Sequence, residues 1–309
     1  MKRVIFLLIF SLILGTAVFE PAHAGFISNK KAQIQQNKLE NSYKKEIQNL
    51  FDKQNEYAKK YDINKVKSLY SPNFIDNDGY TKDVYFSLVE DTWETYPDIT
   101  YTTKIKSINL NGSLATVETE ETSVATADDL DRKLLGELYS ESKCRYFLQR
   151  FSNKWEITAL EVYDEFSVLK YGDARYVKMH LETPKVIGAG QDYTSTLKVE
   201  LPSDYVVVAS INQEKIVNPA TKPQETFKKL NDEQSLSRVF TANTDNVNEY
   251  TVATVGITGA QLVGKDKVKV YVNGLAFVMS RINVIPKNNF ARVDRKTQNK
   301  DENNLEGKI

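Results

Sequence analysis

The sequence predicts a small α+β domain followed by an all-β domain, both carried behind an export signal. Apolar residues recur at helical spacing from about residue 45 to residue 95, and a period of two replaces that spacing from Ile99 onward. After Gly172 the chain holds only short strand-like runs and turns. Helices followed by an antiparallel meander are typical of an α+β domain, whereas short strands without a long helix are typical of a β-sandwich.

Residues 1 to 24 have the three parts of a cleavable signal peptide. Lys2 and Arg3 precede an uncharged stretch from Val4 to Phe19, and the small-residue pattern Ala22-His23-Ala24 follows it. The apolar stretch is shorter than the ~18–20 residues that span a bilayer, although an uncleaved anchor is the alternative. We expect cleavage near Ala24 and a periplasmic or secreted protein without a remaining membrane span.

The composition narrows the available chemistry. Cleavage would leave 39 of the 41 basic and 40 of the 41 acidic residues, so the basic excess of a nucleic-acid-binding surface is missing. Cys144 is the only cysteine, lies in an apolar run and forms no internal disulfide. His180 is the only histidine outside the signal, which disfavours multi-histidine metal sites and histidine-assisted nucleophiles. We expect no cofactor and no metal.

Three helices are predicted before the strands. A polar lead-in over residues 25–44 continues into an apolar helical stripe that ends near Tyr61. Asp62 is positioned to cap a short helix that ends at Ser71-Pro72, and the third helix covers residues 82–95.

Period-two runs predict four strands after the helices. They cover residues 99–110, 113–126, about 135–151 and 155–169, with tight turns at Asn111-Gly112 and Ser152-Asn153. An Asn-Gly pair between two such runs is a strong hairpin signal, because both residues tolerate positive φ.

The remaining strands predict an immunoglobulin-like sandwich over residues 176–286. The candidate strands are 176–182, 192–201, 205–211, 236–243, 249–259, 266–273 and 275–285. Asn273-Gly274 predicts a second hairpin, and residues 213–235 form an insert with a helix expected over 225–230. Residues 287–309 are too polar to build a core, so we expect a disordered tail.

Residues 45–168 resemble a known family. Tyr57 to Phe74 reads as a helix end, an acidic cap and a short helix closing in Leu-Tyr-Ser-Pro. This segment resembles the opening of the nuclear transport factor 2-like (NTF2-like) superfamily, which includes SnoaL-like polyketide cyclases and ketosteroid isomerases. Asn111 to Val117 and Tyr146 to Ile157 resemble its hairpin and last two strands. The resemblance implies a cone over residues 45–172, with three helices on a curved antiparallel sheet around a pocket, and says little about function.

The implied pocket would be rich in aromatic side chains. The candidates for its lining are Tyr57, Tyr61, Tyr80, Phe86, Trp93, Tyr101, Tyr146 and Trp155. Aromatic walls with a few polar groups suit a small apolar or sugar-like ligand, and the alternative is that these rings only fill the core.

Enzymes of this superfamily use an acidic base beside hydrogen-bond donors. The candidate acids are Asp76 and Asp78, in a loop predicted over residues 74–79, and Glu118 and Glu120, which share one strand face. An Asx-turn explains the aspartates equally well, and solvated charges explain the glutamates. Residues 45–168 contain no histidine, which departs from the SnoaL-type pattern and counts against a transferred cyclase mechanism.

These observations favour an exported, non-catalytic module that binds a small apolar ligand or assembles with an envelope protein, with a homodimer formed through the cone sheet. The alternative is an NTF2-like enzyme, an isomerase, dehydratase or hydrolase, acting on a small apolar substrate in the cone. A tethered component of an envelope secretion machine is a third hypothesis.

Overall fold

The computed structural model describes residues 23–129, 134–200, 206–220, 225–230, 234–262 and 268–287. They fall into two units, of which one ends at Lys45 and the other begins at Glu46. Most of the expected signal peptide and nearly all of the expected tail lie outside the described residues. Within the described residues, no helix is both long enough and apolar enough to cross a membrane.

All three predicted helices are present, but the second one ends at Lys67 instead of at Ser71-Pro72. Helix α1 spans His23–Lys59, α2 spans Ile63–Lys67 and α3 spans Lys82–Thr95, the range predicted for the third helix. Asp62 caps α2 as predicted, because its carboxylate accepts a hydrogen bond from the Lys65 amide at 3.1 Å.

The loop predicted over residues 74–79 is wrong in its first part. Strand β1, Tyr70–Asp76, follows α2 and pairs in parallel with β5. Pro72 made the segment look like a helix end, but proline is tolerated at a sheet edge, where no partner needs its amide. Tyr70 and Phe74 are buried in this strand, so burial of their rings favours the extended form.

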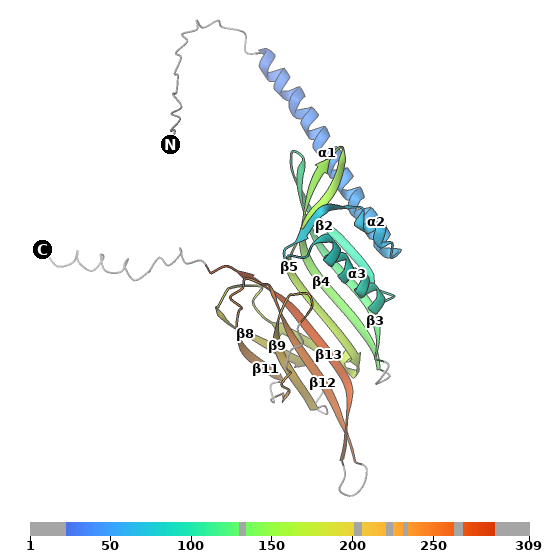
Figure 1. The fold of residues 1–309 in the computed structure, drawn as a ribbon, viewed down its shortest axis with the longest axis vertical. Helices are drawn as coiled ribbons and strands as arrows, with labels where there is room; N and C mark the ends of the chain where they lie inside the picture. Colours follow the sequence, from blue (N-terminus) through green and yellow to red (C-terminus); the bar gives the residue numbers. More distant parts are fainter. Residues whose placement is uncertain are drawn as a thin grey trace, which may run out of the picture. The chain divides into compact units, whose positions relative to one another are not determined.

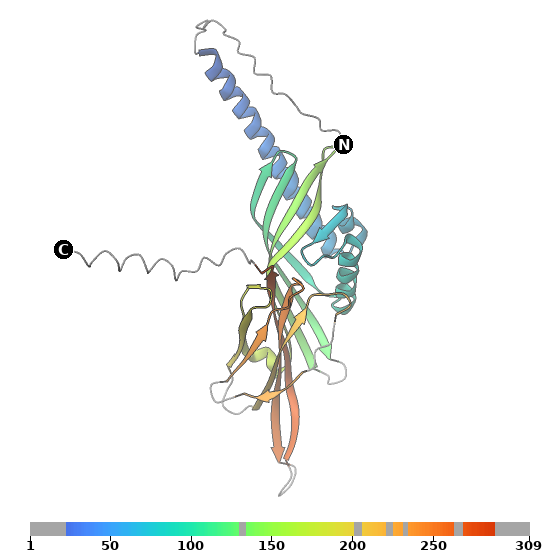
Figure 2. The ribbon, with the colours of Figure 1, turned by 60° about the vertical axis from the view of Figure 1, so that its left-hand side comes forward.

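Four long strands form the curved sheet beneath the helices (Figures 1 and 2). They are β2 (Thr100–Asn111), β3 (Leu114–Asp129), β4 (Leu134–Phe151) and β5 (Lys154–Gly172). The Asn111-Gly112 hairpin is confirmed, since Asn111 pairs with Leu114 and Gly112 has φ +61°. Ser152 and Asn153 make the second tight turn with φ values of +44° and +71°.

The same sheet continues into the C-terminal region. Strand β13 (Val268–Ile285) pairs with β5, giving a ten-stranded sheet with the main order β10-β9-β12-β13-β5-β4-β3-β2. Its other members are β7 (Val186–Gly188), β9 (Val206–Lys215), β10 (Lys228–Lys229) and β12 (Glu249–Leu262). A short 3-10 helix, Asp173–Tyr176, follows β5.

A second, small sheet has three strands in the order β11-β8-β6. They are β6 (Lys178–Glu182), β8 (Asp192–Glu200) and β11 (Ser235–Thr241). Buried apolar residues of this sheet, such as Leu197, share one core with Ile211, Val255 and Val278 of the large sheet. The C-terminal region is therefore two packed layers, one of which belongs to the sheet that also carries the helices.

Two further predictions in this region are wrong. Asn273-Gly274 lies inside β13, where Ile257 pairs with Gly274 and Thr258 pairs with Val272, so Asn273 is the extra residue of a β-bulge. The helix expected over residues 225–230 is replaced by β10, whose two residues pair with β9.

Candidate functional site

Several of the candidate pocket rings fill the core of the helix-bearing region. Phe86, Tyr146 and Trp155 are 3% exposed or less. Tyr70 meets Phe74 and Phe86 edge-on, with ring centroids 5.0 and 4.9 Å apart. These edge-to-face contacts pack the interior, so these three candidates act as core residues there.

Three other candidate rings are partly exposed and contact one another, and we call Tyr61, Trp93 and Tyr101 the aromatic rim. Tyr61 and Trp93 meet edge-on at 5.2 Å, and the Trp93 indole N–H donates to the Tyr101 hydroxyl at 3.1 Å. The Tyr61 hydroxyl donates to the Ile99 carbonyl at 2.8 Å. The two remaining candidates, Tyr57 and Tyr80, are half-buried and line none of the cavities described below.

Glu121 on β3 is a carboxylate that the structure places inside this region, on the same face of the sheet as Glu165 of β5. Its Oε1 accepts hydrogen bonds from the Tyr146 hydroxyl at 2.8 Å and the Thr119 hydroxyl at 3.0 Å. Thr119 is fully buried, and alternate residues of a strand share a face, so Glu121 lies on the inner face of the sheet. Glu121 is not among the acids predicted from the sequence. Its spacing of two and four residues from Thr119 and Val117 would have placed it on the inner face of the strand.

A small cavity of about 120 Å³ opens beside this carboxylate, and we call it the Glu121 cavity. Seven of its eight lining residues carry hydroxyl groups, and we consider five of them together: Tyr101, Thr103, Ser123, Ser140 and Ser142. The strand register places all five on the face that holds Glu121, because Tyr101 pairs with Ser123, Thr103 with Glu121, Ser123 with Ser140 and Glu121 with Ser142.

Burial sets the charge of the groups around this cavity. Desolvation raises the pKa of Glu121, and the hydrogen bonds from Tyr146 and Thr119 offset part of that rise. Burial also raises the pKa of the Tyr146 and Tyr85 hydroxyls well above the ordinary value, so both phenols stay protonated. The pKa of the buried Cys144 thiol is raised by the same cause, which keeps it an unreactive thiol.

A chain of buried hydrogen bonds leads from helix α1 to the Glu121 carboxylate. The Gln54 side chain of α1 donates to the Tyr70 hydroxyl at 3.2 Å, and that hydroxyl interacts with those of Tyr85 and Tyr146. Because Tyr146 donates to Glu121, the orientation of the carboxylate is set by side chains from a helix, an edge strand and the sheet.

The candidate aspartates have structural roles. The Asp76 carboxylate accepts from the backbone amides of Asp78 and Tyr80 at 3.0 and 2.8 Å, which is the Asx-turn considered above. Asp78 forms a two-point ion pair with Arg281 of β13, whose side chain is 1% exposed. Neither carboxylate lines the Glu121 cavity.

The candidate glutamates lie on the opposite face of the sheet from Glu121. Glu118 pairs with Arg145 at 3.2 Å, and Glu120 pairs with Lys106 at 3.0 Å. Both pairs are solvent-accessible, which matches the alternative of solvated surface charges.

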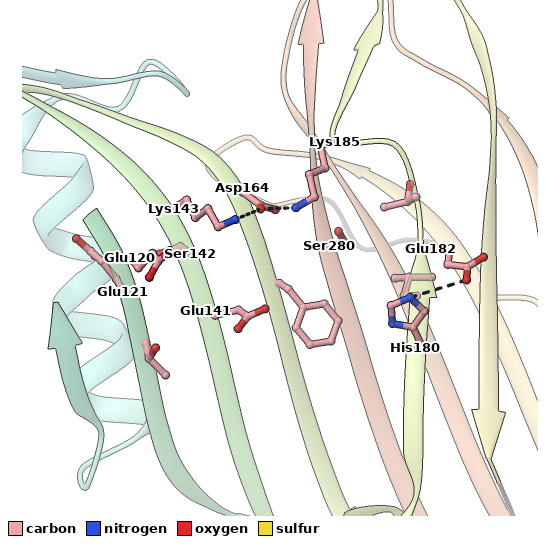
Figure 3. A pocket seen from close by; sticks show the side chains of 14 residues that line it. Glu120, Glu121, Glu141, Ser142, Lys143, Asp164, His180, Glu182, Lys185 and Ser280 are labelled. Atoms are coloured by element: carbon pink, nitrogen blue, oxygen red, sulfur yellow. Dashed lines mark hydrogen bonds and ion pairs between the residues drawn. The ribbon is translucent and has the colours of Figure 1, made fainter. Parts of the chain in front are cut away.

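A larger, charged groove of about 740 Å³ is lined mainly from this opposite face, and Glu121 and Ser142 also belong to its lining (Figure 3). Strands β3, β4, β5 and β13 form one wall, and β6 with the segment after it forms the other. Lys143 and Lys185 both point at Asp164, and exposed His180 lies 3.9 Å from Glu182 (Figure 3). These charges pair with one another, and within the described part of the chain no group of three or more ionisable ligands could hold a metal ion.

Known proteins resemble this chain only weakly and over part of its length. No protein-family model matches the sequence, and no curated protein matches it significantly. Similar solved structures include Bd1075 of Bdellovibrio bacteriovorus, at 12% identity over 38% of this chain, with a TM-score of 0.32. The chain covers only 39% of that protein.

Two other matches cover most of the compared protein. One is a conserved protein from Planctomyces limnophilus DSM 3776, with 14% identity and a TM-score of 0.34. The match covers 39% of this chain and 94% of that protein. The other is hexachlorocyclohexane dehydrochlorinase LinA-type3 from Novosphingobium barchaimii LL02, with 13% identity and a TM-score of 0.31. The match covers 39% of this chain and 85% of that protein. The structural neighbours include NTF2-like proteins, and each match covers about 40% of this chain.

Proposed function

We propose that this chain is an exported, non-catalytic module that binds a small, uncharged polar ligand in the Glu121 cavity. The observation that carries the proposal is the inward carboxyl of Glu121, held by Tyr146 and Thr119 beside a cavity whose other side chains are mainly hydroxyls.

The cavity lining argues for a neutral ligand with its own hydrogen-bonding groups. Hydroxyl groups both donate and accept, and a carboxyl group with a raised pKa can do the same, so the wall can match either kind of ligand atom. No lysine or arginine lines this cavity, so an anionic ligand would lie beside Glu121 without a counter-charge. This lining favours a polar ligand over the small apolar ligand expected from the sequence.

The surroundings of Cys144 and His180 favour binding over catalysis. The thiol of Cys144 is buried and protonated, and His180, the only histidine outside the expected signal, is an exposed residue of β6 in the small sheet. The export address rests on the composition of residues 1–24. Pairing of two copies through the cone sheet and assembly with an envelope protein stay predictions.

Ligand-observed NMR with a panel of neutral alcohol, amide and lactam fragments tests this function. We expect fragments that bind the purified protein to lose binding in Glu121→Leu and to keep it in Glu120→Gln, a matched change one residue away on the opposite face. If no fragment binds, or if Glu121→Leu binds the same fragments equally well, the cavity is not a ligand site.

A second candidate function is acid–base catalysis, and the raised pKa of Glu121 favours it. A carboxyl that titrates closer to neutral pH, beside the phenol of Tyr146, is suited to moving a proton at an activated carbon atom. Deuterium exchange into cyclic ketones in D₂O tests this candidate. Exchange that is lost in Glu121→Gln would favour the enzyme, and the absence of exchange above the buffer rate would favour the binding module.

A further inference from the structure

We propose that the aromatic rim and the Glu121 cavity together bind a neutral saccharide, with one sugar ring on the rim and its hydroxyl groups in the cavity. This inference rests on the proposed function and names the class of its ligand. It combines two surfaces of opposite character that meet at Tyr101, which belongs to both.

The rim offers apolar ring surface rather than hydrogen bonds. The side chains of Tyr61 and Tyr101 are 38% and 37% exposed, so part of each ring is accessible to a ligand. The donors of two rim residues are already engaged, since Tyr61 donates to the Ile99 carbonyl and Trp93 donates to the Tyr101 hydroxyl. The accessible surface that remains is therefore mainly the faces and edges of the rings.

The rim is also held in place before any ligand arrives. Tyr61 has φ +54°, a conformation that a bulky residue rarely adopts. Its ring is fixed by the contact with Trp93 and by the hydrogen bond to Ile99. A rigid aromatic surface loses little conformational entropy on binding, which is a common property of recognition sites.

The cavity supplies what the rim lacks. Its volume of about 120 Å³ equals that of about four water molecules in the liquid, so it admits the hydroxyl edge of a ring rather than a whole ring. A pyranose has an apolar C–H face and an edge of hydroxyl groups. Its C–H face fits the negative face of an aromatic ring, and its edge fits the serine, threonine and carboxyl groups of the cavity.

The hydroxyl lining extends beyond the cavity along the sheet. Ser123, Ser140 and Ser167 are successive cross-strand partners on β3, β4 and β5, and the hydroxyl of Ser167 donates to that of Ser140 at 2.7 Å. A second sugar unit would meet these side chains. We therefore expect an oligosaccharide to bind more tightly than a monosaccharide.

Calorimetric titration with neutral hexasaccharides, namely cellohexaose, xylohexaose, maltohexaose and chitohexaose, tests the inference. We expect at least one to bind the purified protein, and Tyr101→Leu and Trp93→Leu each to weaken that binding by about tenfold or more. Tyr176→Leu is the matched control, because Tyr176 is 80% exposed and lies in the 3-10 helix away from the rim. Circular dichroism of each variant shows whether its fold is kept.

The outcomes separate the two proposals. If neutral fragments bind at Glu121 but no hexasaccharide binds, or if both rim variants bind like the unmodified protein, the saccharide inference is overturned and the binding function stands. If neither fragments nor hexasaccharides bind, both proposals fail. Loss of hexasaccharide binding in Trp93→Leu, with fragment binding kept, is the result that supports the inference, because Trp93 does not line the Glu121 cavity whereas Tyr101 does.

Discussion

Arg281 and Asp78, separated by 203 positions in sequence, form a buried two-point ion pair. The guanidinium nitrogens lie 2.9 and 2.5 Å from the two carboxylate oxygens, and the side chains are 1% and 8% exposed. Glu165 lies 3.9 Å from the same guanidinium and accepts from the Tyr250 hydroxyl at 2.9 Å. This cluster joins the turn after β1 to β13, and so links the helix-bearing region to the C-terminal region.

Replacing Arg281 should therefore be strongly destabilising. Arg281→Met leaves Asp78 and Glu165 in a buried site without a counter-charge, and we expect a loss of about 3–5 kcal/mol in the free energy of unfolding. Arg145→Met is the control, because Arg145 pairs with Glu118 and Glu161 at the surface and should cost about 1 kcal/mol or less. Urea denaturation measures both, and equal losses in the two variants would contradict this account.

Glu121→Gln should stabilise the protein at neutral pH. Burial raises the pKa of Glu121, so between its ordinary value of 4.5 and the raised value the folded state holds a proton that the unfolded state releases. The free energy of unfolding therefore falls as pH rises between these two pKa values, and Glu121→Gln, which has no carboxyl group to titrate, does not lose that stability. Melting temperatures should be higher for Glu121→Gln at pH 7 and should converge with those of the unmodified protein near pH 4.

Removing the charge of the neighbouring Glu120 should change the melting temperature in the opposite direction. The hydrogen bond from Lys106 lowers the pKa of Glu120, so its contribution is present above the unfolded pKa and is lost as pH falls through the lowered one. Glu120→Gln should consequently lower the melting temperature slightly at pH 7. A shift of the same sign in both variants would show that the two side chains do not have the surroundings described above.

Tyr146→Phe should raise the pKa of Glu121 further. The phenol donates to Oε1 of the carboxylate, and a donor stabilises the charged form and lowers the pKa. Tyr139→Phe removes a similar donor from Glu141 on the opposite face, and it should leave Glu121 unchanged. Titration followed by ¹³C NMR of the glutamate carboxyl groups measures both, and an unshifted Glu121 in Tyr146→Phe would refute the hydrogen bond.

The local patterns in the sequence were sufficient for the presence of the three helices and of the four long strands β2 to β5, but not for β1. The limits of α3 and the hairpin at Asn111-Gly112 follow from capping, spacing and turn chemistry, which act over a few residues. The site was harder to predict, because three acids stand close together in Glu118, Glu120 and Glu121. Only the alternation that begins at Val117 separates the inward carboxylate from the two outward ones.

Long-range pairing explains what could not be predicted. The pairing of β5 with β13 joins segments about a hundred residues apart, and no local pattern encodes it. The two Asn-Gly pairs show the consequence. Asn111-Gly112 turns the chain, whereas Asn273-Gly274 lies in a continuous strand because β12 pairs with residues on both sides of it. The same dipeptide therefore gives a hairpin or a bulge according to its partners.

The glycines at this junction give the last prediction. Gly172 and Gly274 are partners where β5 meets β13, and a Cβ atom on Gly172 would lie 2.1 Å from the Asn273 carbonyl oxygen. Gly172 also has φ +56° and ψ −132°, outside the left-handed region that other residues can use. Gly112 has a similar φ, but a Cβ atom there would meet nothing within 4 Å.

Gly172→Ala should therefore cost several times more stability than Gly112→Ala. For Gly112→Ala we expect a loss of about 1–2 kcal/mol from the positive φ alone. Gly172→Ala adds a backbone collision that no side-chain movement relieves, and it should loosen the joint between β5 and β13. Urea denaturation compares the two free energies, and hydrogen exchange at residues 274–280 locates the effect. Similar losses, or unchanged protection of β13, would mean that the two regions do not depend on this close approach.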